Sequence, residues 1–75
     1  MKELLCYIVK SIVEDTEAVN IEEVENENAI VYKVTVAPDD IGRVIGKQGR
    51  IAKAIRTVVR AAANRSGEKV VVEID

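Results

Sequence analysis

Two glycines that bracket two polar residues are the feature of this sequence best suited to chemistry. Gly46 and Gly49 enclose Lys47 and Gln48 within residues 41–51, which read IGRVIGKQGRI. Since glycine lacks a Cβ, a bulky ligand can approach the backbone closely at such a loop. A helix that begins after the loop adds free N–H groups and a dipole that favour an anion. The segment therefore predicts contact with a phosphodiester backbone.

The charge is distributed unevenly along the chain. The 75 residues carry a net charge of −2, but residues 1–37 hold three bases and eight acids, whereas residues 38–75 hold eight bases and five acids. Residues 41–65 contain no acid and seven bases: Arg43, Lys47, Arg50, Lys53, Arg56, Arg60 and Arg65. Arg43 and Arg50 flank the glycine loop and are expected to support it electrostatically. The next three bases could equally form a solvated helix face.

Hydrophobic periodicity predicts the elements of the first half of the chain. Residues 2–15 carry apolar side chains at helical spacing and predict a helix. Residues 18–25 and 30–36 are rich in β-branched residues, and the second segment alternates with period two, so both are predicted strands. The short polar connection between them predicts an antiparallel hairpin.

The second half predicts two helical pieces and a final strand. A helix of about one turn is expected over Ile41–Ile45, with Asp39 or Asp40 as its N-cap. A longer helix is expected over residues 50–65, and a strand over residues 70–74. Within the long helix, the expected core residues are Ile51, Ile55 and Val58.

The predicted order is αββααβ in one domain, residues 1–75. A strand that returns after a helical crossover normally joins a sheet parallel to an earlier strand. We therefore expect an α+β fold: a three-stranded mixed sheet with three helices packed on one face.

The glycine segment resembles a known family. Ile45-Gly46-Lys47-Gln48-Gly49 is similar to the I-G-x-x-G core of KH domains, and the element order resembles their type II arrangement. The length resembles bacterial single-domain KH proteins of the KhpA family, whose typical stretch is similar to residues 41–50, followed by Ala54-Ile55-Arg56 and Ala61-Ala62. The resemblance covers essentially the whole chain.

The resemblance implies a clamp on about four nucleotides of single-stranded RNA. It assigns backbone contact to Gly46, Lys47, Gln48 and Gly49, with Arg50 and Arg43 as electrostatic support. It assigns an apolar groove, on which bases rest, to Ile41, Val44, Ile45 and Ile51. The first three could equally be core residues of the short helix. Polar groups of the strand at residues 32–36 are expected to face the bases.

The composition argues against several other classes. The chain has no His, one Cys, and no visible base beside its serines, so neither catalysis nor a zinc site is expected. Lys47 precedes Gln48 instead of Ser or Thr, so no nucleotide-binding phosphate loop is expected. We expect no catalytic residue, cofactor, metal or small-molecule substrate. Two tyrosines without Phe or Trp are too few for a base-stacking platform.

Two functions are consistent with the sequence. The first is sequence-tolerant binding of single-stranded RNA, as an RNA chaperone or a post-transcriptional regulatory subunit. The alternative is a protein–protein assembly subunit with weak or vestigial RNA binding. The resemblance implies a homodimer or a larger KH-containing partner, and a small domain gains stability from one. No segment approaches the length of a membrane span, and a location in the cytoplasm is expected.

Overall fold

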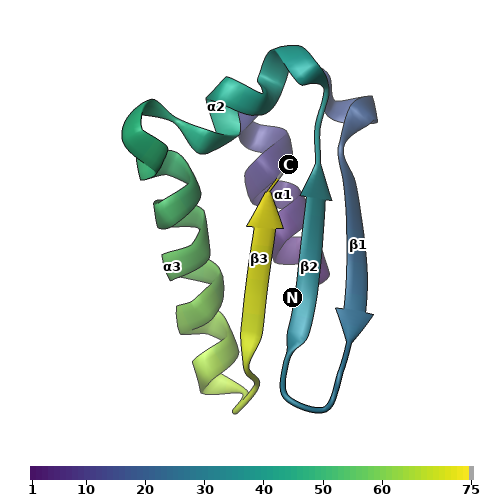
Figure 1. Ribbon diagram of the computed structural model, residues 1–75, viewed down its shortest axis with the longest axis vertical. Coiled ribbons are helices and arrows are strands. Elements are labelled where there is room, and N and C mark those ends of the chain that lie inside the picture. The colour runs from purple at the N-terminus through teal and green to yellow at the C-terminus, as the bar shows by residue number, and fades with distance from the viewer. Residues whose placement is uncertain (75) are drawn as a thin grey trace.

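The computed structural model describes residues 1–74 and has the predicted order of elements (Figure 1). The helices are α1 (Lys2–Ile12), α2 (Ile41–Ile45) and α3 (Arg50–Arg65), and the strands are β1 (Asn20–Glu25), β2 (Ile30–Thr35) and β3 (Val70–Ile74). Short 3-10 turns lie at Thr16–Ala18, Pro38–Asp40 and Lys47–Gly49. Within residues 1–74, no helix combines the length and apolarity needed to cross a membrane.

The sheet is mixed, as predicted, and β2 is its central strand. β1 pairs with β2 antiparallel, and β3 pairs with β2 parallel. The hairpin turn is held by Asn26, whose side-chain oxygen accepts the backbone N–H groups of Asn28 and Ala29 at 2.9 and 2.8 Å. Such an Asx turn is a common way to reverse the chain between strands. β1 and β3 are left as the two edges of the sheet.

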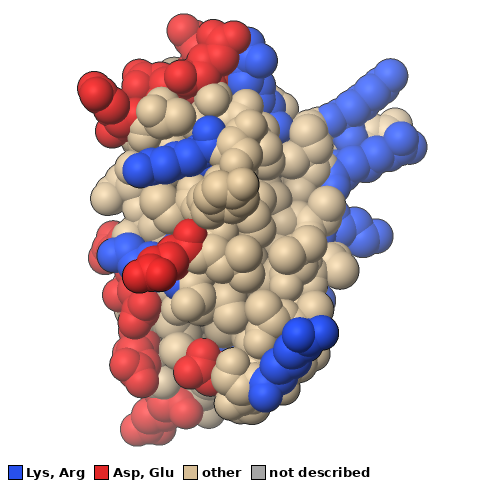
Figure 2. Space-filling model, turned by 180° about the vertical axis from the view of Figure 1, so that it is seen from behind, with Lys and Arg blue, Asp and Glu red and all other residues tan. Residues whose placement is uncertain are grey.

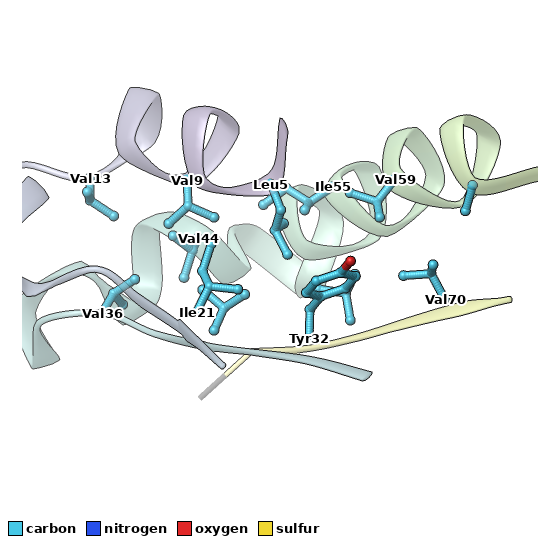
Figure 3. Packing of buried hydrophobic residues seen from close by; sticks show 13 residues of the cluster. Leu5, Val9, Val13, Ile21, Tyr32, Val36, Val44, Ile55, Val59 and Val70 are labelled. Carbon is cyan, nitrogen blue, oxygen red and sulfur yellow. The ribbon is translucent and has the colours of Figure 1, made fainter. Parts of the chain in front are cut away.

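The core lies between the sheet and the helices on its one covered face (Figures 1 and 3). Five of its large side chains are fully buried: Leu5, Val9, Val34, Val44 and Val59. The core prediction for α3 holds for Ile55 but is wrong for Ile51 and Val58, which are 37% and 49% exposed. The reason is that α3 packs through the stripe Ala52, Ile55, Val59 and Ala63, which turns the flanking residues outward.

Among residues 1–74, Asp40 is the one charged residue that is buried, with 2% of its surface exposed. Its carboxylate accepts the backbone N–H groups of Glu14 and Asp15, each at 3.1 Å. Asp40 is the N-cap residue of α2, as predicted, but its carboxylate makes no capping bond there and instead bonds to the connection between α1 and β1. The N–H groups of Asp15 and Glu14, with Arg43 nearby, hold the pKa of Asp40 below its usual range.

Asp40→Asn is expected to lower the midpoint of thermal unfolding at pH 7, because one amide oxygen cannot accept both N–H groups as the carboxylate does. Since the folded-state pKa is depressed, the contribution of Asp40 is present above its unfolded value of about 3.8 and is lost as the pH falls through the folded-state value. The difference in unfolding midpoint between wild type and variant should therefore become smaller below about pH 4. Circular dichroism melts from pH 7 to pH 2 measure it.

The exposed neighbour supplies the control. Asp39→Asn removes the same charge one residue away, where the side chain is exposed, and should change the midpoint little. A gap for Asp40→Asn that stays constant from pH 7 to pH 2 would contradict the role assigned to the Asp40 carboxylate.

Candidate nucleic-acid interface

The loop of residues 46–49 joins α2 to α3 in an unusual backbone conformation. The φ angle is positive at three of its four residues: Gly46 (76°), Gln48 (58°) and Gly49 (74°). Gln48 is the one non-glycine residue with positive φ within residues 1–74. This conformation costs an L-residue about 1–2 kcal/mol. Strain of this kind persists where the surroundings enforce it, and it is common at ligand-binding loops.

The glycines around the loop are needed for different reasons. A Cβ on Gly46 would lie 2.6 Å from Cγ1 of Ile51, so packing within the chain requires glycine there. A Cβ on Gly49 or Gly42 would meet no atom within 4 Å. A ligand can therefore approach the backbone closely at Gly49 and Gly42, whereas packing of the Ile51 side chain explains the glycine at position 46.

Positive charge and free backbone donors meet at the start of α3. Lys47 and Arg50 are exposed, and neither forms an ion pair within residues 1–74. Nη2 of Arg50 donates to Oε1 of Gln48 at 3.4 Å, across the turn. No side chain caps α3, whose N-cap residue is Gly49. The end of a helix in this state favours an anion such as a phosphate.

Arg43 differs from the other two bases near the loop. Its Nη2 lies 2.9 Å from Oε1 of Glu14, and its Nε lies 3.2 Å from Oδ1 of Asp40. Two carboxylates thus offset the charge of this guanidinium. The predicted electrostatic support from Arg43 is correspondingly weakened, and its geometry fits a structural contact between α2 and the segment that follows α1.

The apolar residues predicted to form the groove do not share one environment. Val44 is fully buried in the core, so the prediction that it faces RNA is wrong: a one-turn helix buries its central apolar residue. Ile41 and Ile45 are partly buried against that core. Ile51 is partly exposed beside Gly46. No pocket is found in the part of the chain that the structure describes, so the candidate interface is an open surface.

The strand beside α3 is β3 and not β2 (Figure 1). Residues 32–35 lie in the central strand, where residues 32–34 are paired on both sides and Tyr32 and Val34 are buried under the helices. The exposed Lys33 and Thr35 alternate with them and face away from the helices. Base contacts from residues 32–36 stay a prediction, and the strand that packs beside α3 is β3.

The sequence alone does not distinguish Arg56 from Lys53 and Arg60, which are exposed. The Arg56 side chain is partly buried, and its Nε donates to the backbone oxygen of Val72 at 3.1 Å. Helical spacing gives no sign of this bond, because Val72 lies 16 residues away on β3.

Opposite charges gather on opposite sides of the molecule. Figure 2 shows basic side chains along the side formed by α3 and acidic side chains along the side formed by β1, with an uncharged expanse between them. The uneven charge along the sequence is thus also a separation in space. An approaching polyanion is attracted to the α3 side and repelled by the β1 side.

Comparisons with known proteins agree along the whole chain. A family model described as "KhpA/KhpB, KH domain" matches residues 2–74. "RNA-binding protein KhpA" of Clostridium perfringens is 58% identical over 74 residues, 99% of each chain. The proteins of the same name from Chlamydia trachomatis and Listeria monocytogenes are 51% and 49% identical over 99% of this chain, and 95% and 97% of theirs.

The fold also occurs within a larger protein. A crystal structure of Aquifex aeolicus Era Y63A bound to GDP.AlF4- superposes with a TM-score of 0.71 at 18% identity. The match covers 96% of this chain and 28% of that one. At this identity the likeness concerns the fold alone.

Gly46→Ala and Gly42→Ala are expected to have opposite effects on stability. The first places a Cβ against Ile51 at positive φ and should reduce the free energy of unfolding by at least about 2 kcal/mol. The second adds a Cβ to an open position of α2 and should be neutral or stabilise by up to about 1 kcal/mol. Urea denaturation measures both, and equal losses would contradict this assignment.

Proposed function

Because this chain belongs to the KhpA/KhpB KH-domain family, we propose that it is an RNA-binding protein that holds single-stranded RNA at the loop of residues 46–49. The observation that carries the proposal is the loop itself. It joins two helices in a strained turn and leaves the side of Gly49 open. It also places Lys47 and Arg50, which form no ion pair within residues 1–74, at the start of α3, where no side chain caps the helix. The proteins it resembles bear the name RNA-binding protein.

The proposed contacts are mainly to the RNA backbone. The loop residues Gly46, Lys47, Gln48 and Gly49 would contact phosphates, and Arg50 would add its charge. Arg43 supports this set only indirectly, since its guanidinium is paired with Glu14 and Asp40. Ile41 and Ile45 would offer their exposed parts as an apolar floor, and Ile51 would support the loop from beside Gly46.

From the loop alone, we expect weak binding of RNA with little preference for its sequence. Backbone contacts fix register without reading sequence, and the loop contains one base and one neutral amide. We infer a role as an RNA chaperone or a post-transcriptional regulatory subunit. The cytoplasm stays the predicted location.

Lys47→Asp combined with Gln48→Asp is expected to abolish RNA binding while the fold is kept, because both side chains are exposed and two acids would face the phosphates. Fluorescence anisotropy with a labelled single-stranded octamer measures binding, and circular dichroism measures folding. A folded double variant that binds with full affinity would contradict the loop assignment.

A charge-matched variant and the salt dependence complete this experiment. Lys2→Asp combined with Asn28→Asp makes the same change in net charge at exposed positions outside the loop and should leave most of the affinity intact. For about two to four contacted phosphates, the logarithm of affinity should fall with the logarithm of salt at a slope of roughly −1.4 to −2.8. A flat dependence speaks against phosphate contact.

A second candidate function, compatible with the first, is assembly with another KH domain. It is favoured by apolar side chains exposed on the outer sides of α1 and α3: Leu4, Tyr7 and Val58, with Tyr7 74% exposed. The uncharged expanse in Figure 2 lies on the face of the molecule where the helices cover the sheet. Within the small-residue end of α3, Ala61 is exposed but Ala63 is buried in the core. A second copy of this chain or a larger KH-containing protein would cover such a surface.

Self-association is tested by light scattering coupled to size exclusion over a concentration series. We expect a dimer that dissociates on dilution, and Val58→Lys should shift it to monomer. Val71→Lys is the matched control, because Val71 is similarly exposed but lies on a strand rather than on the outer helices. A strict monomer at high concentration would overturn the homodimer.

A further inference from the structure

Arg56 is held differently from the bases beside it on α3. Lys53 and Arg60 are exposed, as in a solvated helix face. Arg56 instead folds toward the sheet and is partly buried, with its Nε 3.1 Å from the backbone oxygen of Val72. One N–H donor of the guanidinium is therefore used to fix the whole planar group against β3.

The acceptor of this bond lies on a free edge of the sheet. β3 pairs only with β2, so its other edge has no neighbouring strand within residues 1–74. Exposed edges carry unpaired backbone groups that can bond to other molecules. Arg56 donates to one of these groups, the backbone oxygen of Val72. Its charged guanidinium therefore lies at the boundary between α3 and the edge of β3.

The rest of the guanidinium is free for a ligand. Its two Nη groups donate to no atom of residues 1–74, and no carboxylate there lies within ion-pair distance of them. No buried side-chain nitrogen or oxygen of those residues lacks a partner. Both Nη groups must therefore reach solvent, where they can donate to a ligand, while the Nε bond holds the guanidinium in place.

Arg56 also lies within reach of a strand held at the loop. It follows Gly49 by seven residues of α3, which is about 10 Å along a helix at about 1.5 Å per residue. Four stacked nucleotides, the length that a KH loop clamps, extend over about 10 Å at roughly 3.4 Å per step. An RNA that leaves the loop along α3 would bring a base to this position.

We propose that Arg56 is a specificity-determining residue that reads the edge of one nucleobase, an inference that rests on the proposed RNA-binding function. A planar guanidinium bonds best to two adjacent acceptors. Guanine offers O6 with N7, and cytosine offers O2 with N3, whereas every acceptor of adenine and uracil on a pairing edge stands beside a donor. The chemical class selected is thus RNA with a guanine or cytosine at this position.

The competing explanation is that Arg56 only covers the sheet edge. Arg56→Lys separates the two, because lysine keeps the charge and can still donate to Val72 but has no planar fork. A structural role, or a contact to phosphate, predicts an equal effect on all RNA sequences. A base-reading role predicts a loss confined to guanine and cytosine.

The test compares four RNA octamers, C8, U8, A8 and (UG)4, by fluorescence anisotropy at one salt concentration. Wild type should bind C8 and (UG)4 at least about fivefold more tightly than U8 and A8. Arg56→Lys should reduce that ratio to within about twofold while U8 affinity stays constant. In Arg56→Gln, whose amide fits adenine, the ratio of C8 to A8 affinity should fall as well.

Arg60→Lys on the same helix is the matched control and should keep the preference of wild type, since Arg60 is exposed. Circular dichroism melts confirm that each variant is folded. Equal binding of all four octamers by wild type, or an unchanged preference in both Arg56 variants, would overturn this inference alone. Absence of binding to any octamer would overturn the proposed function and this inference with it.

Discussion

The contact between Gly46 and the Ile51 side chain is the constraint on which the rest of the interface depends. With no room for a Cβ at residue 46, the chain turns there through a backbone conformation that only glycine adopts easily. Gln48, in the same turn, also has a positive φ, and α3 begins after the turn without a side-chain cap. This turn positions the exposed Lys47 and Arg50, because Lys47 lies within it and Arg50 directly follows it.

A second contact connects this corner to the body of the domain. Asp40 accepts two N–H groups from the segment after α1 and lies beside Arg43 of α2. α2 is only one turn long and could not hold its own orientation. Because Asp40, directly before α2, bonds to the segment after α1 and Val44 is buried in the core, the orientation of the short helix is fixed and it supports the loop. The ion pair of Arg43 with Glu14 strengthens the same connection.

The surfaces of the domain are divided by charge and polarity. Basic side chains are concentrated along the side of α3 and acidic ones along the side of β1. The outer helices also carry the exposed apolar side chains Leu4, Tyr7 and Val58. Binding of a polyanion and association with another protein would therefore use different surfaces of one small molecule. This arrangement lets both proposed functions operate together.

The sequence by itself determined the element order, the mixed sheet and the place of the glycine loop, because these follow from local periodicity and glycine chemistry. Only the tertiary structure decided which residues face outward. It buried Val44, exposed Val58, placed β2 at the centre of the sheet, and paired Arg43 with carboxylates. Asp40 and Arg56 received their roles from partners 25 and 16 residues away. Such contacts depend on how helices and strands meet in space, and no spacing along the chain encodes them locally.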